Sequence, residues 1–222
     1  MILLAVTFVI IFINIILGLI VFLGGIKNAS NIIFFLLTLV FSLLSVVNYI
    51  SLLANDPMSM LFWVRLVMVL AATHTFLFVI LARSFPDDKI KYDNFFKIIL
   101  VSFIGIIFLS FSTFVFEKIN LINDRIITVP GKLIVLYGAW AMFCISCAIY
   151  LLYKKYKNEL VDGSKKYQLR FILIGSLITY SLLIVMNFIV VNVFQYTAVV
   201  KLTAIFSLPF IVLTFYAILK HG

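Results

Sequence analysis

Residues 63–76 read WVRLVMVLAATHTF, an apolar stretch that carries two ionisable side chains, Arg65 and His74. It belongs to an apolar block at 60–82. At about 1.5 Å per residue, such a block can cross a hydrocarbon layer of about 30 Å as an α-helix. A helix suits lipid because it satisfies every backbone N–H and C=O group internally. The stretch therefore predicts a membrane helix in which Arg65 and His74 need an explanation.

The rest of the chain has the same character. Hydrophobic residues make up 65% of the 222 residues and charged residues 11%, which is too little polar surface to cover a soluble globule. Apolar blocks separated by turn and charge signals predict an all-α, polytopic membrane protein, a seven-transmembrane-helix bundle. It is expected to fill residues 1–222 as a single domain with no soluble output domain. The expected spans are 2–23, 32–53, 60–82, 96–116, 133–153, 169–194 and 200–219.

The basic residues predict how these spans are oriented. The first block has no basic segment before it and no small-residue cleavage site, so we expect a retained helix and not a signal peptide. If the N-terminus is outside, four basic residues fall in outer segments: Lys118, Arg125, Lys132 and Lys201. Twelve then fall in inner segments: Lys27, Arg83, Lys89, Lys91, Lys97, Lys154, Lys155, Lys157, Lys165, Lys166, Arg170 and Lys220. This excess predicts an N-terminus outside and a cytoplasmic C-terminus.

The same distribution explains the net charge of +9 without nucleic acid. The basic segment 154–170, KKYKNELVDGSKKYQLR, has two interpretations. It either serves only to fix the topology or also lies against anionic lipid headgroups.

The residue types argue against several classes of activity. All eight acidic residues fall in predicted loops or at helix ends, which disfavours a proton relay at mid-membrane depth. The sequence has no H-E-x-x-H and no G-x-S-x-G motif, so we expect no enzyme activity in this chain. Cys144 and Cys147 form a C-x-x-C pair inside an apolar block, where packing is a simpler role than metal or redox chemistry. We expect no metal and no cofactor.

Arg65 has two interpretations. It lies about five residues inside the outer end of its block, so its guanidinium can extend outward and anchor the helix to headgroups or backbone carbonyls. Alternatively, Asn48, Trp140 and Asn187 lie at similar depth on other blocks and line one outward-facing ligand cavity with it. In that case Arg65 would bind a carboxylate or phosphate with its planar fork.

His74 and Pro209 also allow alternatives. His74 is nine residues after Arg65, so at 100° per residue the two side chains lie about 180° apart around the helix. It is either a neutral core histidine or a proton sensor, since imidazole titrates near neutrality. Pro209 lies inside the last block, where it is either a signalling hinge or a static kink.

Several block ends carry short motifs: RSFPDD at 83–88, KYQLRFILIG at 166–175 with Asn187 further on, and YAILKHG at 216–222. In this order they resemble the seven-helix N-terminal sensor region of bacterial membrane histidine kinases and related signalling proteins. The resemblance implies a last helix that continues into a cytoplasmic signalling module. Because this chain stops at Gly222, we expect an excised sensor region or a stand-alone form with a separate output partner.

We therefore expect a sensor or receptor in the bacterial cytoplasmic (inner) membrane. It would bind a small ligand, anionic if Arg65 is the clamp, and signal through the last helix to a cytoplasmic kinase or other signalling module. The alternatives are a small transporter or channel for a neutral or lipid-like solute, and a subunit that only scaffolds other membrane proteins. The bilayer is an expected partner, nucleic acid is not, and a homodimer is left open.

Overall fold

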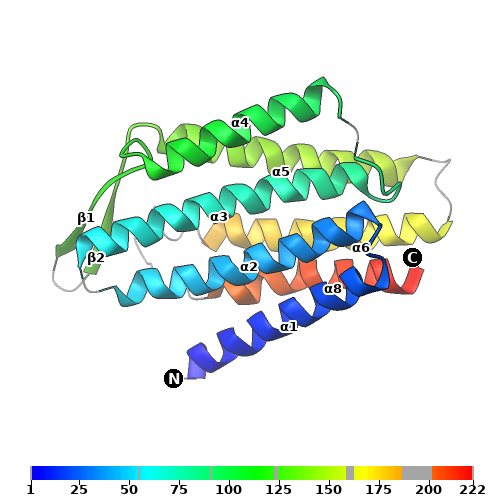
Figure 1. The fold of residues 1–222 in the computed structure, drawn as a ribbon, viewed down its shortest axis with the longest axis horizontal. Coiled ribbons are helices and arrows are strands. Elements are labelled where there is room, and N and C mark those ends of the chain that lie inside the picture. The colour runs from blue at the N-terminus through cyan, green and yellow to red at the C-terminus, as the bar shows by residue number, and fades with distance from the viewer. Residues whose placement is uncertain are drawn as a thin grey trace.

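The computed structural model describes residues 2–54, 56–90, 92–122, 125–158, 163–186 and 202–221. Figure 1 shows a bundle of nearly parallel and antiparallel helices with a β-hairpin at one end. In these residues, six helices are long and apolar enough to cross a membrane, and α8 carries a shorter apolar stretch, Thr203–Leu219. The elements are α1 (Ile2–Gly24), α2 (Ala29–Leu53), α3 (Pro57–Ser84), α4 (Asn94–Phe111), β1 (Phe116–Ile122), β2 (Arg125–Pro130), α5 (Ile134–Lys157), α6 (Gly163–Leu183) and α8 (Thr203–His221).

Each of the seven predicted blocks overlaps one of these helices, so the prediction of a helical, multi-pass bundle is confirmed. The largest difference in a start lies in α6, which begins at Gly163 and not at residue 169. The first turns of α6 carry exposed basic residues, Lys165 and Lys166, which a prediction from apolar residues alone leaves out. The predicted end of that block, residue 194, lies outside the described residues.

The predicted extension of the fourth helix to residue 116 is wrong. The α4 helix ends at Phe111, and β1 and β2 form an antiparallel hairpin in which Ile119 pairs with Thr128. Ser112 explains the helix end, because its hydroxyl donates to the Leu109 carbonyl at 2.6 Å and accepts from the Phe114 N–H at 3.2 Å. Such local bonds compete with helix continuation.

Aspartate side chains begin two of the helices. Asp56 precedes Pro57 and accepts the N–H groups of Met58 and Ser59 at 3.0 and 2.9 Å. Asp93 similarly accepts the Phe96 N–H at 2.9 Å at the start of α4. A carboxylate at this position satisfies N–H groups that lack helical partners and complements the helix dipole.

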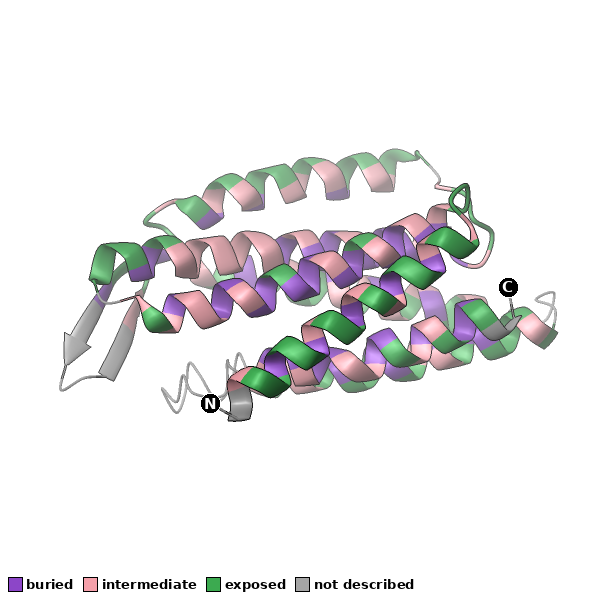
Figure 2. Cartoon of the chain, turned by 60° about the horizontal axis from the view of Figure 1, so that its bottom comes forward, coloured by how far each residue is buried: buried purple, intermediate pink, exposed green. Residues whose placement is uncertain are grey.

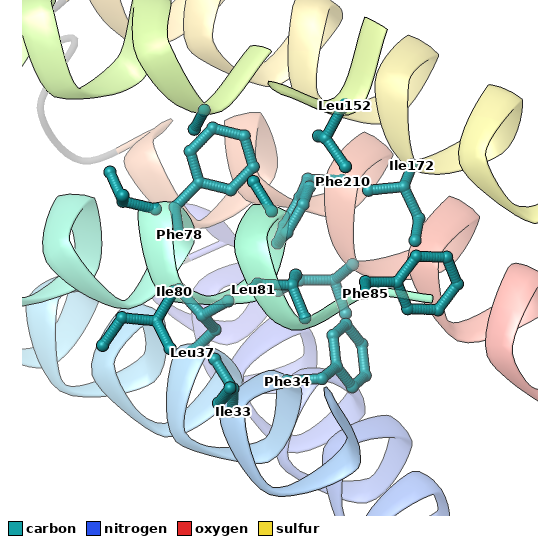
Figure 3. Packing of buried hydrophobic residues seen from close by; sticks show 14 of the residues in the cluster. Ile33, Phe34, Leu37, Phe78, Ile80, Leu81, Phe85, Leu152, Ile172 and Phe210 are labelled. Atoms are coloured by element: carbon teal, nitrogen blue, oxygen red, sulfur yellow. The ribbon is translucent and has the colours of Figure 1, made fainter. Parts of the chain in front are cut away.

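Among the described elements, five helices form a closed ring. Around it, α2 packs against α3, α3 against α5, α5 against α6, α6 against α8, and α8 against α2. The α1 helix lies outside the ring against α2 and α8, and α4 lies outside it against α3. The ring interior is filled by large side chains from all five helices, including Phe34, Phe78, Leu152, Ile172 and Phe210 (Figure 3).

The outer surface of the bundle is apolar. On α1 the buried residues recur at helical spacing, namely Thr7, Ile10, Asn14, Gly18 and Val21. The opposite face exposes large side chains such as Phe8 (58%) and Phe12 (66%), and α4 exposes Phe108 (74%). Figure 2 shows this division between covered and exposed helix faces. Apolar surface on this scale fits lipid and not water. The chain is a multi-pass membrane protein.

The two ends of the bundle differ in charge. The described termini lie at opposite ends (Figure 1). The hairpin end includes Lys118 and Lys132. The opposite end, which we call the lysine-rich end, gathers Lys27, Arg83, Lys89, Lys97, Lys154, Lys155, Lys157, Lys165, Lys166 and Arg170.

Candidate functional site at the crossing of α6 and α8

The crossing of α6 and α8 combines a proline, a glycine and a bond between the two helices. Pro209 lies inside α8 and cannot donate a backbone hydrogen bond to the carbonyl one turn earlier. The next residue, Phe210, donates its backbone N–H to Thr179 Oγ1 on α6 at 3.0 Å. A Cβ at Gly175 would lie 3.0 Å from the Pro209 carbonyl oxygen. The two backbones therefore meet at the point where proline interrupts the bonding of α8.

A buried group of rings lies beside this crossing. The His74 ring of α3 is 3.8 Å from the Phe41 ring of α2, measured between centroids. Phe78, one turn further along α3, contacts Tyr180 of α6 at 4.5 Å and Phe210 of α8 at 5.6 Å. Through these rings, α3 touches both helices of the crossing.

His74 is buried, with 4% of its surface exposed. The Tyr180 hydroxyl lies 3.5 Å from both ring nitrogens. Each nitrogen therefore has one long contact, and both contacts are with the same hydroxyl. A neutral imidazole has one donor and one acceptor nitrogen, and the hydroxyl can serve either one. The described carboxylates, Asp56, Asp87, Asp88, Asp93 and Glu117, all lie at or beyond helix ends. The surroundings of His74 are compatible with a neutral imidazole, and both predicted roles, core histidine and proton sensor, stay predictions.

Arg65 lies on the other side of α3 and joins it to the hairpin. Its guanidinium donates from Nη2 to the Phe116 carbonyl oxygen at 2.9 Å. The Nε atom is buried and has no hydrogen-bond partner among the described residues. Three residues further along α3, the Met68 carbonyl oxygen accepts from the Tyr137 hydroxyl of α5 at 2.8 Å. The bond to Phe116 is of the kind that the anchor interpretation requires, and it leaves part of the guanidinium without a partner.

The other predicted cavity residues bond to different neighbours. Asn48 of α2 is buried and donates to Thr203 Oγ1 of α8 at 3.5 Å. Trp140 of α5 donates from Nε1 to Ser102 Oγ of α4 at 3.0 Å. Asn187 lies outside the described residues. Arg65, Asn48 and Trp140 thus bond to three separate elements, and a cavity shared among them stays a prediction.

Sequence reasoning missed the residues that form the crossing. Gly175 and Thr179 are four residues apart, a spacing of small residues that is typical of close helix contacts in membranes and could have identified them. The partner side could not be found this way, because nothing local indicates that the Phe210 N–H faces α6.

Cys144 and Cys147 lie on α5 as free thiols, the first buried and the second half-buried. Comparison of the chain with protein families, with curated proteins and with solved structures finds no match. The class that the fold defines is a multi-pass helical membrane protein, and its function has to be inferred from the geometry.

Proposed function

We propose that the chain is a membrane-embedded sensor module of a bacterial signalling protein. In this proposal a stimulus at the hairpin end changes the angle of α8 at Pro209, and the far end of α8 acts on a cytoplasmic kinase or other signalling module. The observation that carries the proposal is the bond from the Phe210 N–H to Thr179. It holds α6 and α8 together at the one point where proline removes a bond internal to α8.

The hairpin end supplies the input of this relay. Arg65 bonds to the Phe116 carbonyl, and a ligand carboxylate or phosphate would compete for the same guanidinium with two charge-assisted bonds. Such a ligand would break this bond between the hairpin and α3. The change has a physical route to the crossing, because α3 contacts Tyr180 and Phe210 through Phe78. The signal requires a ligand that binds the two arrangements with different affinity.

The proposal also assigns an orientation. The lysine-rich end of the bundle faces the cytoplasm, by the excess of basic residues in short segments on that side. The N-terminus is then outside, and the end of α8 is inside, where a signalling partner can reach it. The membrane is the bacterial inner membrane.

Distance measurements between spin labels test the relay. The labels are placed at Arg170→Cys on α6 and Leu219→Cys on α8, both exposed positions at the lysine-rich end, after Cys144→Ala and Cys147→Ala. In nanodiscs of two bilayer thicknesses, and with acetate or phosphate added, we expect two distance populations whose ratio changes. Pro209→Ala should leave one population. A single distribution that no lipid, anion or substitution changes would exclude the relay.

One observation favours transport of a small solute as a second candidate. Asn14, near the middle of α1, donates to Ser207 Oγ of α8 at 3.3 Å, and its Oδ1 is buried without a partner among the described residues. With Asn48 and Thr203 these groups form a polar line through apolar helices. Solute flux into proteoliposomes that disappears in Asn14→Leu would favour transport over sensing.

A further inference from the structure

The lysines at the end of α5 and the start of α6 fall into two groups. Lys155 is half-buried, and its ammonium donates to the carbonyl oxygens of Arg83, at 2.7 Å, and of Phe85. These carbonyls belong to the end of α3, where a cation complements the helix dipole. Lys155 is therefore a structural residue of the helix bundle.

The second group points outward and lies against tyrosine rings. The Lys157 ammonium lies 5.1 Å from the centre of the Tyr153 ring. The Lys166 ammonium of α6 lies 5.8 Å from the centre of the Tyr156 ring of α5. Both lysines are exposed, and the two rings are three residues apart on one helix. We call Tyr153, Tyr156, Lys157 and Lys166 the lysine–tyrosine face.

The surroundings of this face are those of a headgroup layer. Tyr150, one turn deeper on α5, is 61% exposed, and on α6 Ile174 is 38% exposed, so apolar surface continues below the lysines. Lys154, Lys165 and Arg170 are also exposed here. The segments 150–158 and 163–174 contain no aspartate or glutamate. Tyrosine is typical of the interface, where its ring and hydroxyl meet apolar and wet surroundings.

We propose that the lysine–tyrosine face binds the headgroup of an anionic phospholipid. The two ammonium groups bind the lipid phosphate and its additional negative charge, and the rings hold the ammonium groups at headgroup depth. Acyl chains lie along the exposed apolar surface below. A role in topology alone would need only positive charge and would treat Lys155, Lys157 and Lys166 alike. This proposal does not depend on the sensor function, since the face would bind lipid whatever α8 does.

Native mass spectrometry of the whole chain with equal amounts of phosphatidylglycerol and phosphatidylcholine tests the proposal. We expect wild type to retain phosphatidylglycerol preferentially. Lys157→Gln combined with Lys166→Gln should lower that preference about 25-fold, since one basic residue near an anionic surface contributes about fivefold. The matched control is Lys118→Gln with Lys132→Gln, two exposed lysines at the hairpin end, which should keep the preference.

Lys155→Gln separates binding from stability. It should lower the unfolding temperature and keep the lipid preference. The double variant of the lysine–tyrosine face should keep the unfolding temperature and lower the lipid preference. The proposal is overturned if that double variant keeps the wild-type preference, if the hairpin-end control loses as much, or if wild type retains both lipids equally.

Discussion

Replacing Gly175 by alanine perturbs the crossing of α6 and α8 with a single methyl group. That group would lie 3.0 Å from the Pro209 carbonyl oxygen, 3.1 Å from Phe210 Cα and 3.2 Å from Leu213 Cβ. Two of these atoms belong to the backbone of α8, so a side-chain rotation cannot remove the contact. The two helices must move apart by a few tenths of an ångström, which also lengthens the bond from Phe210 to Thr179.

The magnitude follows from two opposing effects. Glycine to alanine inside a helix stabilises it by about 1 kcal/mol, whereas overpacking a tight contact costs about 1–3 kcal/mol. Gly105 on α4 is the matched control, because a Cβ there would meet no atom within 4 Å. Gly105→Ala should therefore gain up to about 1 kcal/mol. We expect Gly175→Ala to be less stable than Gly105→Ala by about 1–3 kcal/mol.

The assay is reversible unfolding of both variants and wild type in lipid bicelles, with helicity as the signal. Spin-label distances between α6 and α8 should change in Gly175→Ala and stay at the wild-type value in Gly105→Ala. Equal changes in the free energy of unfolding for the two variants, with unchanged distances, would refute the close contact at the crossing.

Three further predictions concern the bundle ends. Arg65→Ala should speed hydrogen exchange of the hairpin amides, because the bond to the Phe116 carbonyl is lost. It should also weaken binding of an acidic ligand at least tenfold, about 1.4 kcal/mol. Unchanged exchange and unchanged binding would contradict both roles. The Arg83 guanidinium holds the pKa of Asp93 below its ordinary value of 3.8. The ionised carboxylate therefore stabilises the fold above pH 3.8, and this contribution is lost as the pH falls through the lower pKa of the folded state. An Asp93→Asn variant whose stability deficit persisted in stronger acid would contradict this. Lys155→Met should lower the free energy of unfolding by about 1 kcal/mol in thermal or chemical unfolding, because two carbonyls at the end of α3 lose their cationic donor. A variant as stable as wild type would show that these carbonyls need no cationic donor.

The helices could be predicted because each property that defines them is local. An apolar run of sufficient length, bounded by Asp56 with Pro57 or by Asp93, predicts a span without knowledge of its neighbours. The hairpin was missed because its two strands, within residues 116–130, are short, are mixed in polarity and follow an apolar helix directly. The exact end of α4 depends on the hydroxyl of Ser112, which composition does not indicate.

The site could be predicted only in part. Depth along a helix follows from counting, and the separation of Arg65 from His74 around α3 agrees with the different neighbours they contact. Which helix each side chain faces depends on the rotation and order of the helices in the bundle. For this reason Asn48 and Trp140, chosen for similar depth, bond to α8 and α4 and not to a common centre with Arg65.

The relay requires the lysine-rich end of the bundle to face the cytoplasm. The most direct test places single cysteines at exposed positions of the two ends, Lys118→Cys in the hairpin and Lys89→Cys between α3 and α4, after Cys144→Ala and Cys147→Ala. A membrane-impermeant thiol reagent is then added to intact cells. We predict labelling of Lys118→Cys in intact cells and of Lys89→Cys only after the membrane is opened. The reverse pattern, or labelling of both cysteines in intact cells, would contradict the orientation and the relay with it.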